Sequence, residues 1–410
     1  MRPQNPSTKS PILKAPSLPP PRRRRHRTPS PVDNAMREIF MRLPADEPGS
    51  LVPAAAVCRS WFRILFDAAF ARDYRAFRGA PPMLGFLHNE SPVYKRPYWV
   101  SHFVSTTAFS PPEFEDLEEY QVLDSRHGLV LLYSPEMGEH FVVSHLLTHE
   151  DWEIHVDPKC HGIMRWEDDG PDDASKGIRC NAAVLCDKDQ CDHLDCHGGP
   201  FLVALVGSDN AEGSTGLATV YSSKTREWSD VISVHLHEPD LIYERAHSAV
   251  VGNKVYVPCV ESTCVLEYDI GEQELSVISV PYEDQDESQR YVDLMGVEDG
   301  MLLFASVMKP RLYLWSMEAG PNGATGWARR RFIELEPLLP RSVLLDNWTV
   351  SAVGFAEGVG VIFVSTQSGL YTIELSSRRC NHVNVEGHIK KAMPYMSFYI
   401  GGVEACCRPG

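Results

Sequence analysis

The chain has 410 residues, of which 43% are apolar and 23% are charged, proportions that are typical of globular domains and exclude wholesale disorder. Its formal net charge is −16, yet residues 1–32 contain eight Lys or Arg and no acidic residue, so the remainder is more acidic still. An acidic body repels phosphate backbones, and nucleic-acid binding by the main domain is therefore not expected.

Membrane and secreted classes are also disfavoured. No apolar run reaches the roughly 18–20 residues of a membrane span, and no apolar segment follows the N-terminal charges as a secretory signal requires. The 11 cysteines are an odd number in a chain without an export signal, which indicates reduced thiols rather than a disulfide framework. We therefore expect a protein of the nucleus, the cytoplasm or both.

Residues 1–31 are predicted to form a disordered basic arm. They contain nine prolines and few residues that could be buried, so they cannot offset the entropy of ordering. The basic run from Arg22 to Arg27 matches a nuclear-import signal or a phosphate-binding patch, but a solvated tail is the favoured interpretation.

Residues 32–80 have helical periodicity and are predicted to form a small helical module. Asp33 or Asn34 can cap a first helix, which Pro44 and Pro48-Gly49 are expected to end. A second helix is expected from Ser50 to Val57, with Pro53 tolerated in its first turn. The apolar faces of the first, third and fourth helices fall at Met36, Ile39, Phe40 and Leu43, at Trp61, Ile64 and Leu65, and at Phe70, Tyr74 and Phe77.

After Pro81-Pro82 the helical periodicity stops and short β-type runs alternate with turns. A loose unit, in which a glycine precedes an apolar run, recurs at Gly252, Gly300 and Gly358, with spacings of 48 and 58 residues. Such spacings are close to one four-stranded propeller blade with loop insertions. The pattern predicts a β-propeller of six or seven blades over residues 84–400, followed by a tail at 401–410.

Two stretches carry a family resemblance. They are Met36-Arg37-Glu38-Ile39-Phe40-Met41-Arg42-Leu43-Pro44 and Val57-Cys58-Arg59-Ser60-Trp61-Phe62-Arg63-Ile64-Leu65. The second is similar to the V-C-[KR]-x-W-x-x-[LI] signature of F-boxes, and together they resemble the divergent F-boxes of plant, grass-type proteins. The β-rich remainder resembles the kelch-like, propeller-type domain that follows such F-boxes.

The resemblance implies a non-catalytic adaptor without a cofactor. An F-box binds a Skp-family linker, which joins a cullin scaffold in an SCF-type ubiquitin ligase, while the C-terminal domain captures a protein substrate for ubiquitination. The family pattern places two residues in the F-box core, Trp61 and Ile64, and six nearest the linker: Ile39, Phe40, Leu43, Pro44, Val57 and Leu65.

One departure from the family pattern leaves an alternative open. F-boxes usually open with Leu-Pro, whereas Ser30-Pro31-Val32 stands in that region of this chain. The first anchor to the linker is altered, so an F-box-derived interaction protein that no longer joins a ligase remains a second hypothesis.

One segment offers metal ligands: Cys186, Cys191, His193, Cys196 and His197, with Cys180 upstream. Zinc takes four nitrogen or sulfur ligands, which this segment can supply. However, the cysteines are spaced as Cys-x4-Cys twice rather than as the Cys-x2-Cys knuckles of structural zinc sites. An acidic, cysteine-rich loop between strands is therefore favoured over zinc.

Enzyme signatures are missing from the sequence, which lacks a Gly-x-Ser-x-Gly elbow, a phosphate-binding Walker loop, a Gly-x-Gly-x-x-Gly turn and a His-Glu-x-x-His motif. Because some propellers are enzymes, a zinc- or copper-dependent propeller enzyme is a third hypothesis.

Acidic clusters at 113–119, 167–173 and 283–287 fall where blade loops are expected. They could attract a basic protein substrate, although solvated loops that aid solubility are the favoured interpretation.

Overall fold

The computed structural model describes residues 31–44, 48–90, 100–111, 120–134, 140–148, 150–164, 180–189, 191, 193, 196, 199–208, 215–236, 247–259, 264–280, 294–308, 310–319, 325–345, 350–385 and 389–398. Residues 1–30 of the basic arm expected at 1–31, the tail at 401–410 and the three acidic clusters lie outside these residues, whereas Pro31 lies in the first helix. None of the described helices has the length and apolar character needed to cross a membrane.

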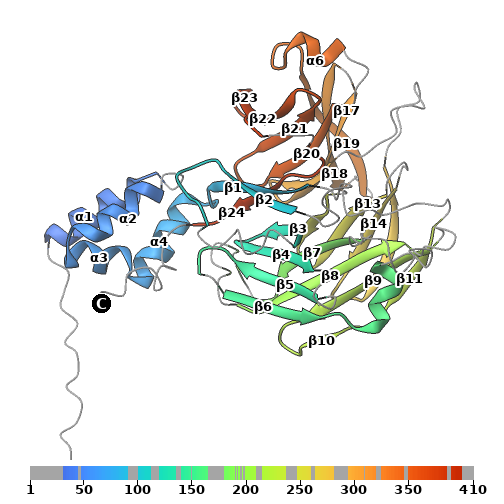
Figure 1. The fold of residues 1–410 in the computed structure, drawn as a ribbon, viewed down its shortest axis with the longest axis horizontal. Helices are drawn as coiled ribbons and strands as arrows, with labels where there is room; N and C mark the ends of the chain where they lie inside the picture. Colours follow the sequence, from blue (N-terminus) through green and yellow to red (C-terminus); the bar gives the residue numbers. More distant parts are fainter. Residues whose placement is uncertain are drawn as a thin grey trace, which may run out of the picture.

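Four short helices form a module to one side of a much larger β domain (Figure 1). They are α1 (Pro31–Arg42), α2 (Pro48–Val57), α3 (Arg59–Leu65) and α4 (Ala68–Arg78). Their buried residues Phe40, Phe70 and Tyr74 form one core, in which the Phe40 ring lies edge-on to Trp61 at a centroid distance of 5.2 Å. Edge-to-face aromatic pairs of this kind add to the free energy gained by burial.

The helix boundaries differ from the predicted ones at proline residues. Helix α1 begins at Pro31, and α2 begins at Pro48, which had been expected to end the preceding helix. Proline is favoured at the first helical position because the N–H that it lacks has no partner there. Pro53 consequently lies inside α2 rather than in its first turn. Phe77, expected in the core, is 60% exposed because it lies one residue before the end of α4.

The β domain is a six-bladed propeller, as Figure 1 shows. Named from the innermost strand outward, its blades are as follows. Blade 1 is β3 (Gln121–Arg126), β4 (Leu129–Ser134), β5 (His140–His145) and β6 (Glu150–His155). Blade 2 is β7 (Asn181–Cys186), β8 (Phe201–Ser208), β9 (Thr215–Ser222) and β10 (Glu227–Trp228), with β11 (Ile232–His235) also paired to β9.

Blade 3 is β12 (Ala249–Val251), β13 (Lys254–Pro258), β14 (Cys264–Asp269) and β15 (Glu274–Ser279). Blade 4 is β16 (Leu294–Glu298), β17 (Met301–Met308), β18 (Arg311–Ala319) and β19 (Thr325–Glu334). Blade 5 is β20 (Ser351–Ala356), β21 (Val361–Thr366), β22 (Gly369–Glu374) and β23 (Cys380–Val383). Blade 6 is β24 (Met393–Met396), β1 (Met83–Glu90) and β2 (Val100–Ser105). Among the described residues, three short helices lie between strands: η2 (Pro158–Cys160), α5 (His161–Met164) and α6 (Arg341–Leu345).

Blade 6 closes the ring with strands from the two ends of the domain. The C-terminal β24 pairs antiparallel with β1, so that Leu87 lies opposite Met393 and Phe86 opposite Pro394. At the centre of the ring β24 contacts both β3 of blade 1 and β20 of blade 5. The propeller therefore begins and ends in the same sheet.

Among the described residues, one buried hydrophobic cluster lies between each pair of neighbouring blades. In β4, for example, Leu131 packs toward blade 2 while Val130 and Leu132 pack toward blade 6. Because successive side chains point to opposite faces of a strand, a strand between two blades must be apolar at every position. This requirement explains the continuous apolar runs in the sequence.

The recurring glycines form the tight turns between the first and second strands of the blades. In blade 1 the turn is His127-Gly128 (φ 54° and 80°), and in blade 4 it is Asp299-Gly300 (φ 54° and 75°). Two successive positive φ angles match the twist of a two-residue hairpin and favour glycine. Blade 2 departs from this pattern, because residues 187–200 connect its first two strands.

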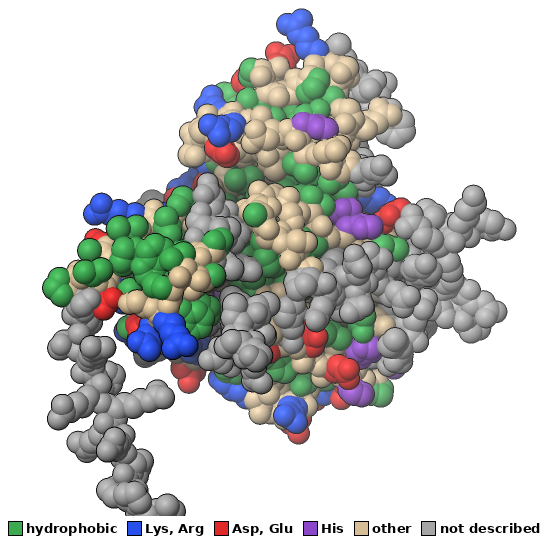
Figure 2. Space-filling model, turned by 60° about the vertical axis from the view of Figure 1, so that its left-hand side comes forward, with side chains coloured by type: hydrophobic (Ala, Val, Ile, Leu, Met, Phe, Trp, Pro, Cys, Tyr) green, Lys and Arg blue, Asp and Glu red, His purple; other side chains and the backbone are tan. Residues whose placement is uncertain are grey.

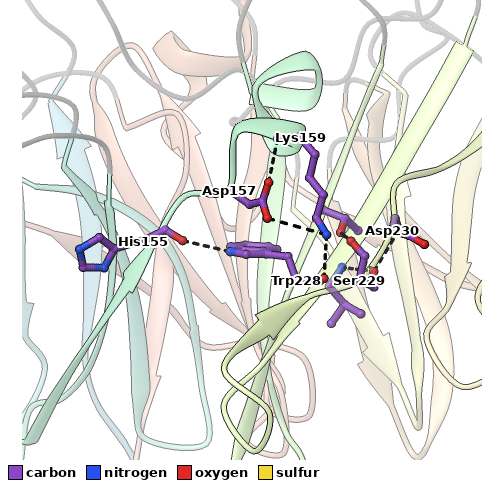
Figure 3. Close-up of polar contacts among 8 residues, drawn as sticks. His155, Asp157, Lys159, Trp228, Ser229 and Asp230 are labelled. Carbon is purple, nitrogen blue, oxygen red and sulfur yellow. Dashed lines mark hydrogen bonds and ion pairs between the residues drawn. The ribbon is translucent and has the colours of Figure 1, made fainter.

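Tryptophans on outer strands link neighbouring blades. The Trp228 Nε1 of blade 2 donates a hydrogen bond to the His155 carbonyl of blade 1 at 3.0 Å, and the Lys159 Nζ donates to the Trp228 carbonyl at 2.8 Å (Figure 3). In the same way, the Trp327 Nε1 of blade 4 donates to the Ser279 carbonyl of blade 3 at 3.0 Å.

Replacing Trp228 with phenylalanine should lower the free energy of unfolding by about 1–2 kcal/mol. Phenylalanine keeps most of the apolar contact but leaves the His155 carbonyl without its donor. Urea denaturation of the full-length variant measures the change. A loss below about 0.3 kcal/mol would show that the indole hydrogen bond does not strengthen the seam between blades 1 and 2.

A buried histidine makes stability dependent on pH. His88 in β1 is 7% exposed, and burial, with a smaller contribution from the charge of His102, lowers the pKa of His88 to about 4. In the unfolded chain the same group titrates near pH 6.5. Below pH 6.5 the unfolded state therefore binds a proton that the folded state does not, and stability falls as the pH is lowered toward 4.

We expect His88 alone to remove about 2 kcal/mol of stability between pH 7.5 and pH 5. Denaturation of the wild type and of His88→Asn at both pH values isolates this contribution, because the variant lacks the titrating group. Equal losses in the two proteins would mean that His88 does not couple folding to pH.

Candidate functional site

The helical module carries most of the exposed large apolar side chains. Of the seven found among the described residues, five lie in this module: Val32, Ile39, Val57, Phe62 and Phe77. Figure 2 shows hydrophobic side chains gathered over it. Helix α2 adds to this character because it contains no charged residue. A solvent-exposed helix normally has a polar outer face, so an apolar one indicates a surface for another protein.

The six residues expected to contact a linker differ in how far their side chains are exposed. Ile39 and Val57 are 53% and 63% exposed, Pro44 is also exposed, and Leu43 is half-buried. Phe40 and Leu65 are buried in the core of the module, so their side chains are not accessible in this conformation, contrary to the expectation. Trp61 and Ile64, expected in the core, are half-buried and pack against it. Contact with a linker remains a prediction.

The last described residues of the chain attach the module to the propeller. Beyond β24, Phe398 joins the core of the helical module and lies edge-on to Tyr74 at 6.2 Å. The Ser397 N–H donates to the Pro82 carbonyl at 3.2 Å. The segment that closes the ring therefore also holds the module.

A cavity of about 260 Å³ opens near this attachment, and its lining is rich in polar residues. Its wall includes Arg126 from β3, His247 before β12, Glu357 after β20, and Pro81 and Met396 next to the module. Residues from blades 1, 3, 5 and 6 thus meet in one space, which places the cavity at the central channel.

Arg126 is the centre of an ionic cluster in this channel, in which the side chains of Arg126 and Asp124 are 12% and 9% exposed and that of Glu357 is 38% exposed. The Arg126 Nε lies 3.0 Å from Asp124 Oδ2 and its Nη1 lies 3.6 Å from Glu357 Oε1, while Nη2 donates to the Ser248 carbonyl. Asp124 Oδ2 also accepts the Val184 N–H of blade 2 at 2.9 Å. Burial raises the pKa of Glu357, an effect that the charge of Arg126 opposes. One guanidinium therefore connects blades 1, 3 and 5.

The predicted metal ligands come together in the connection between β7 and β8. Four donor atoms, from Cys186, Cys191, His193 and Cys196, lie within 4.8 Å of one another. The Cys191 and Cys196 sulfurs are 3.8 Å apart, and the Cys196 sulfur is 3.6 Å from His193 Nδ1. Burial and the neighbouring thiols raise the pKa of Cys196. His197, the fifth candidate, lies outside the described residues.

Sequence reasoning did not find the ionic cluster. The signal that could have found it is the pair Asp124 and Arg126, which are two residues apart in a strand and therefore share one face of it. Opposite charges on one face of a strand inside the propeller indicate a polar feature in the interior. Glu357 could not have been added, because only the folded ring brings this residue of blade 5 close to Arg126 of blade 1 at the central channel.

Comparisons with solved structures give distant similarity to other chains. They include the extracellular domain of a putative hybrid two-component system from B. thetaiotaomicron (9% identity, TM-score 0.33, 64% of this chain and 27% of that one) and YCF48 bound to D1 peptide (9%, 0.38, 80% and 96%). A third is the WD40 domain of SCAP from fission yeast (12%, 0.33, 68% and 56%). The chain thus spans about a quarter of the length of the first of these.

No curated protein matches the chain significantly. A family model described as "F-box protein AT5G49610-like, beta-propeller" matches residues 121–399. This match covers blades 1 to 5 and reaches β24 of blade 6, more than half of the chain. The chain therefore belongs to the F-box protein AT5G49610-like β-propeller family.

Proposed function

We propose that this protein is the substrate-recognition subunit of an SCF-type ubiquitin ligase. In this role the helical module binds a Skp-family linker and, through it, a cullin scaffold, while the propeller captures a protein substrate for ubiquitination. The observation that carries the proposal is the concentration of exposed apolar side chains on a helical module joined to a propeller of an F-box protein family.

The exposed apolar side chains of the helical module favour binding to a partner protein that buries them. Ile39 lies on α1 and Val57 ends α2, and the uncharged α2 leaves Pro53 and Ala56 exposed beside Val57. Burial of such side chains in a groove of a partner helix or sheet contributes about 1.5–3 kcal/mol for each large apolar residue. The adaptor role requires no catalytic group from this chain.

The propeller supplies the other half of the proposed role. Its blade interfaces are closed by six apolar clusters, so the ring is a rigid support for loops that can bind a substrate. A basic substrate remains a prediction, because the acidic clusters on which it depends lie outside the described residues.

Calorimetric titration of the full-length protein with a purified Skp-family linker tests the proposal. The double substitution Ile39→Asp with Val57→Asp should weaken binding by at least about 30-fold, because it places two charges in an apolar interface. Both residues are exposed, so the fold should be retained. The matched control is Phe332→Asp on β19, which also alters an exposed apolar residue, 44% exposed, but lies in the propeller.

Absence of linker binding by the wild type at micromolar concentration would overturn the proposal. It would favour the alternative of an F-box-derived interaction protein that joins no ligase, which the unusual start at Pro31 and Val32 motivates. Equal weakening by the double variant and the Phe332→Asp control would instead show that the helical module is not the binding surface.

A further inference from the structure

Blade 2 differs from blades 1 and 4 at the turn between its first two strands. In blades 1 and 4 this turn has two residues, His127-Gly128 and Asp299-Gly300, whereas residues 187–200 replace it in blade 2. The base of this loop is held by the Asp187 N–H, which donates to the Pro200 carbonyl at 2.8 Å. Of the loop residues that the structure describes, Cys196 alone is buried.

We propose that this loop is a structural zinc site, with Cys186, Cys191, His193 and Cys196 as its four ligands. Cys186 ends β7 and the other three lie in the loop, so the metal would tie the loop to the sheet.

Two of the distances between donor atoms are those of a tetrahedral zinc centre, and all four donor atoms lie within 4.8 Å of one another. With Zn–S bonds of about 2.3 Å and a Zn–N bond of about 2.0–2.1 Å, two sulfurs lie about 3.8 Å apart and a sulfur and a nitrogen about 3.6 Å apart. The separations found are 3.8 Å between Cys191 and Cys196 and 3.6 Å between Cys196 and His193. A disulfide would require about 2.05 Å between sulfurs, so the two thiols are placed as co-ligands rather than as a bonded pair.

The surroundings of the ligands also suit bound thiolates. The Lys188 backbone N–H hydrogen-bonds to the Cys186 sulfur, and the Cys191 N–H donates to the Lys188 carbonyl at 3.3 Å, which turns the chain from one ligand to the next. His193 has a left-handed backbone, with φ of 58°, and its Nδ1 lies 3.6 Å from the Cys196 sulfur. An N–H directed at sulfur stabilises its negative charge.

The ligand set favours a structural role over a catalytic one. Three sulfurs and one nitrogen in tetrahedral array select zinc among common metals, and four protein ligands leave no open position for a substrate. The site therefore differs from that of a metal-dependent propeller enzyme, which would keep one coordination position for water or substrate.

The metal would also fix the wall of the central channel. The His193 ring lies 4.5 Å from the His127 ring, and both residues line the channel cavity together with Pro81 and Met396, where the helical module is attached. Holding His193 in place thus fixes one wall of that cavity. This inference rests on the ligand geometry and is independent of the proposed ligase function.

Metal analysis of the full-length protein, purified without chelators, tests the site. We expect about one zinc ion per chain in the wild type and less than roughly one tenth of that in Cys196→Ser. Cys380→Ser is the matched control, since Cys380 is half-buried in β23 and outside the cluster; it should keep its zinc. His193→Cys, which supplies four sulfur ligands, should also retain zinc, whereas His193→Ala should bind it less tightly.

Two measurements on the wild type keep the test valid if a cysteine variant does not fold. X-ray absorption at the zinc edge should fit three sulfurs at about 2.3 Å and one nitrogen at about 2.0–2.1 Å. Removal of zinc by a chelator should expose Cys186, Cys191 and Cys196 to alkylation, and added zinc should protect them again. Protein without zinc, a different bound metal, a Cys191–Cys196 disulfide, or alkylation unchanged by the chelator would each overturn the proposal.

Discussion

Replacing Arg126 with methionine should lower the free energy of unfolding by about 3–5 kcal/mol, the cost of removing one partner from a buried ion pair. Methionine has a similar length, so little cavity is created. Both carboxylates, however, lose the same guanidinium, whose Nε lies 3.0 Å from Asp124 Oδ2 and whose Nη1 lies 3.6 Å from Glu357 Oε1. Two carboxylates would then face one channel without a cation between them. Chemical denaturation of the full-length variant measures the loss.

A double-mutant cycle isolates the electrostatic coupling between Arg126 and Glu357. Glu357→Gln removes one of the two negative charges but keeps the size of the side chain, so Arg126→Met should cost at least about 1 kcal/mol less in that background. Equal costs in both backgrounds would show that the charge of Glu357 does not couple to Arg126, and that the loss comes from the contacts of Arg126 with Asp124 and Ser248 and from packing.

Replacing Phe40 with alanine should unfold the helical module while the propeller stays folded. Phe40 is 2% exposed and contacts both Trp61 and Phe70, and truncation of such a core aromatic costs about 3–5 kcal/mol. A module of this size has little stability to lose. Hydrogen exchange should therefore show protection lost across residues 31–78 and retained in the six blades.

The neighbouring residue on the same helix supplies the control. Ile39 is 53% exposed, so Ile39→Ala should change stability by no more than about 0.5 kcal/mol. If the proposed function is right, Phe40→Ala and the double aspartate variant at Ile39 and Val57 both lose linker binding, but only Phe40→Ala loses exchange protection. Unchanged protection in Phe40→Ala would mean that the four helices are held together elsewhere.

The propeller could be predicted because its turns require particular residues. Positive φ angles select glycine at Gly128, Gly252, Gly300 and Gly358, so the blade repeat is visible in the sequence. The number of blades, predicted as six or seven, is six. Blade 6 leaves no continuous repeat in the sequence, because its inner strand, with Pro394, comes from the far end of the domain and its two other strands precede blade 1.

The candidate sites were predictable only in part, because a sequence pattern does not show which side chains the fold buries or brings together. The apolar pattern of α1 identified the residues of one face, but could not say that Phe40 points inward and Ile39 outward. The spacing of the cysteines argued against zinc, since Cys-x4-Cys is not the usual knuckle. Closure of the loop by pairing of β7 with β8 brings those residues together regardless of their spacing.

The pairing of β1 with β24 has a consequence for the order in which the protein is made. Strands β1 and β2 leave the ribosome early, but the strand that must lie inside them, Met393–Met396, is synthesised about 300 residues later. Until then the inner edge of β1 is unpaired, and the position of β24 between β3 of blade 1 and β20 of blade 5 is unfilled. Because exposed strand edges promote aggregation, the nascent chain is vulnerable until β24 has been synthesised, and the ring can close only after that strand has paired with β1.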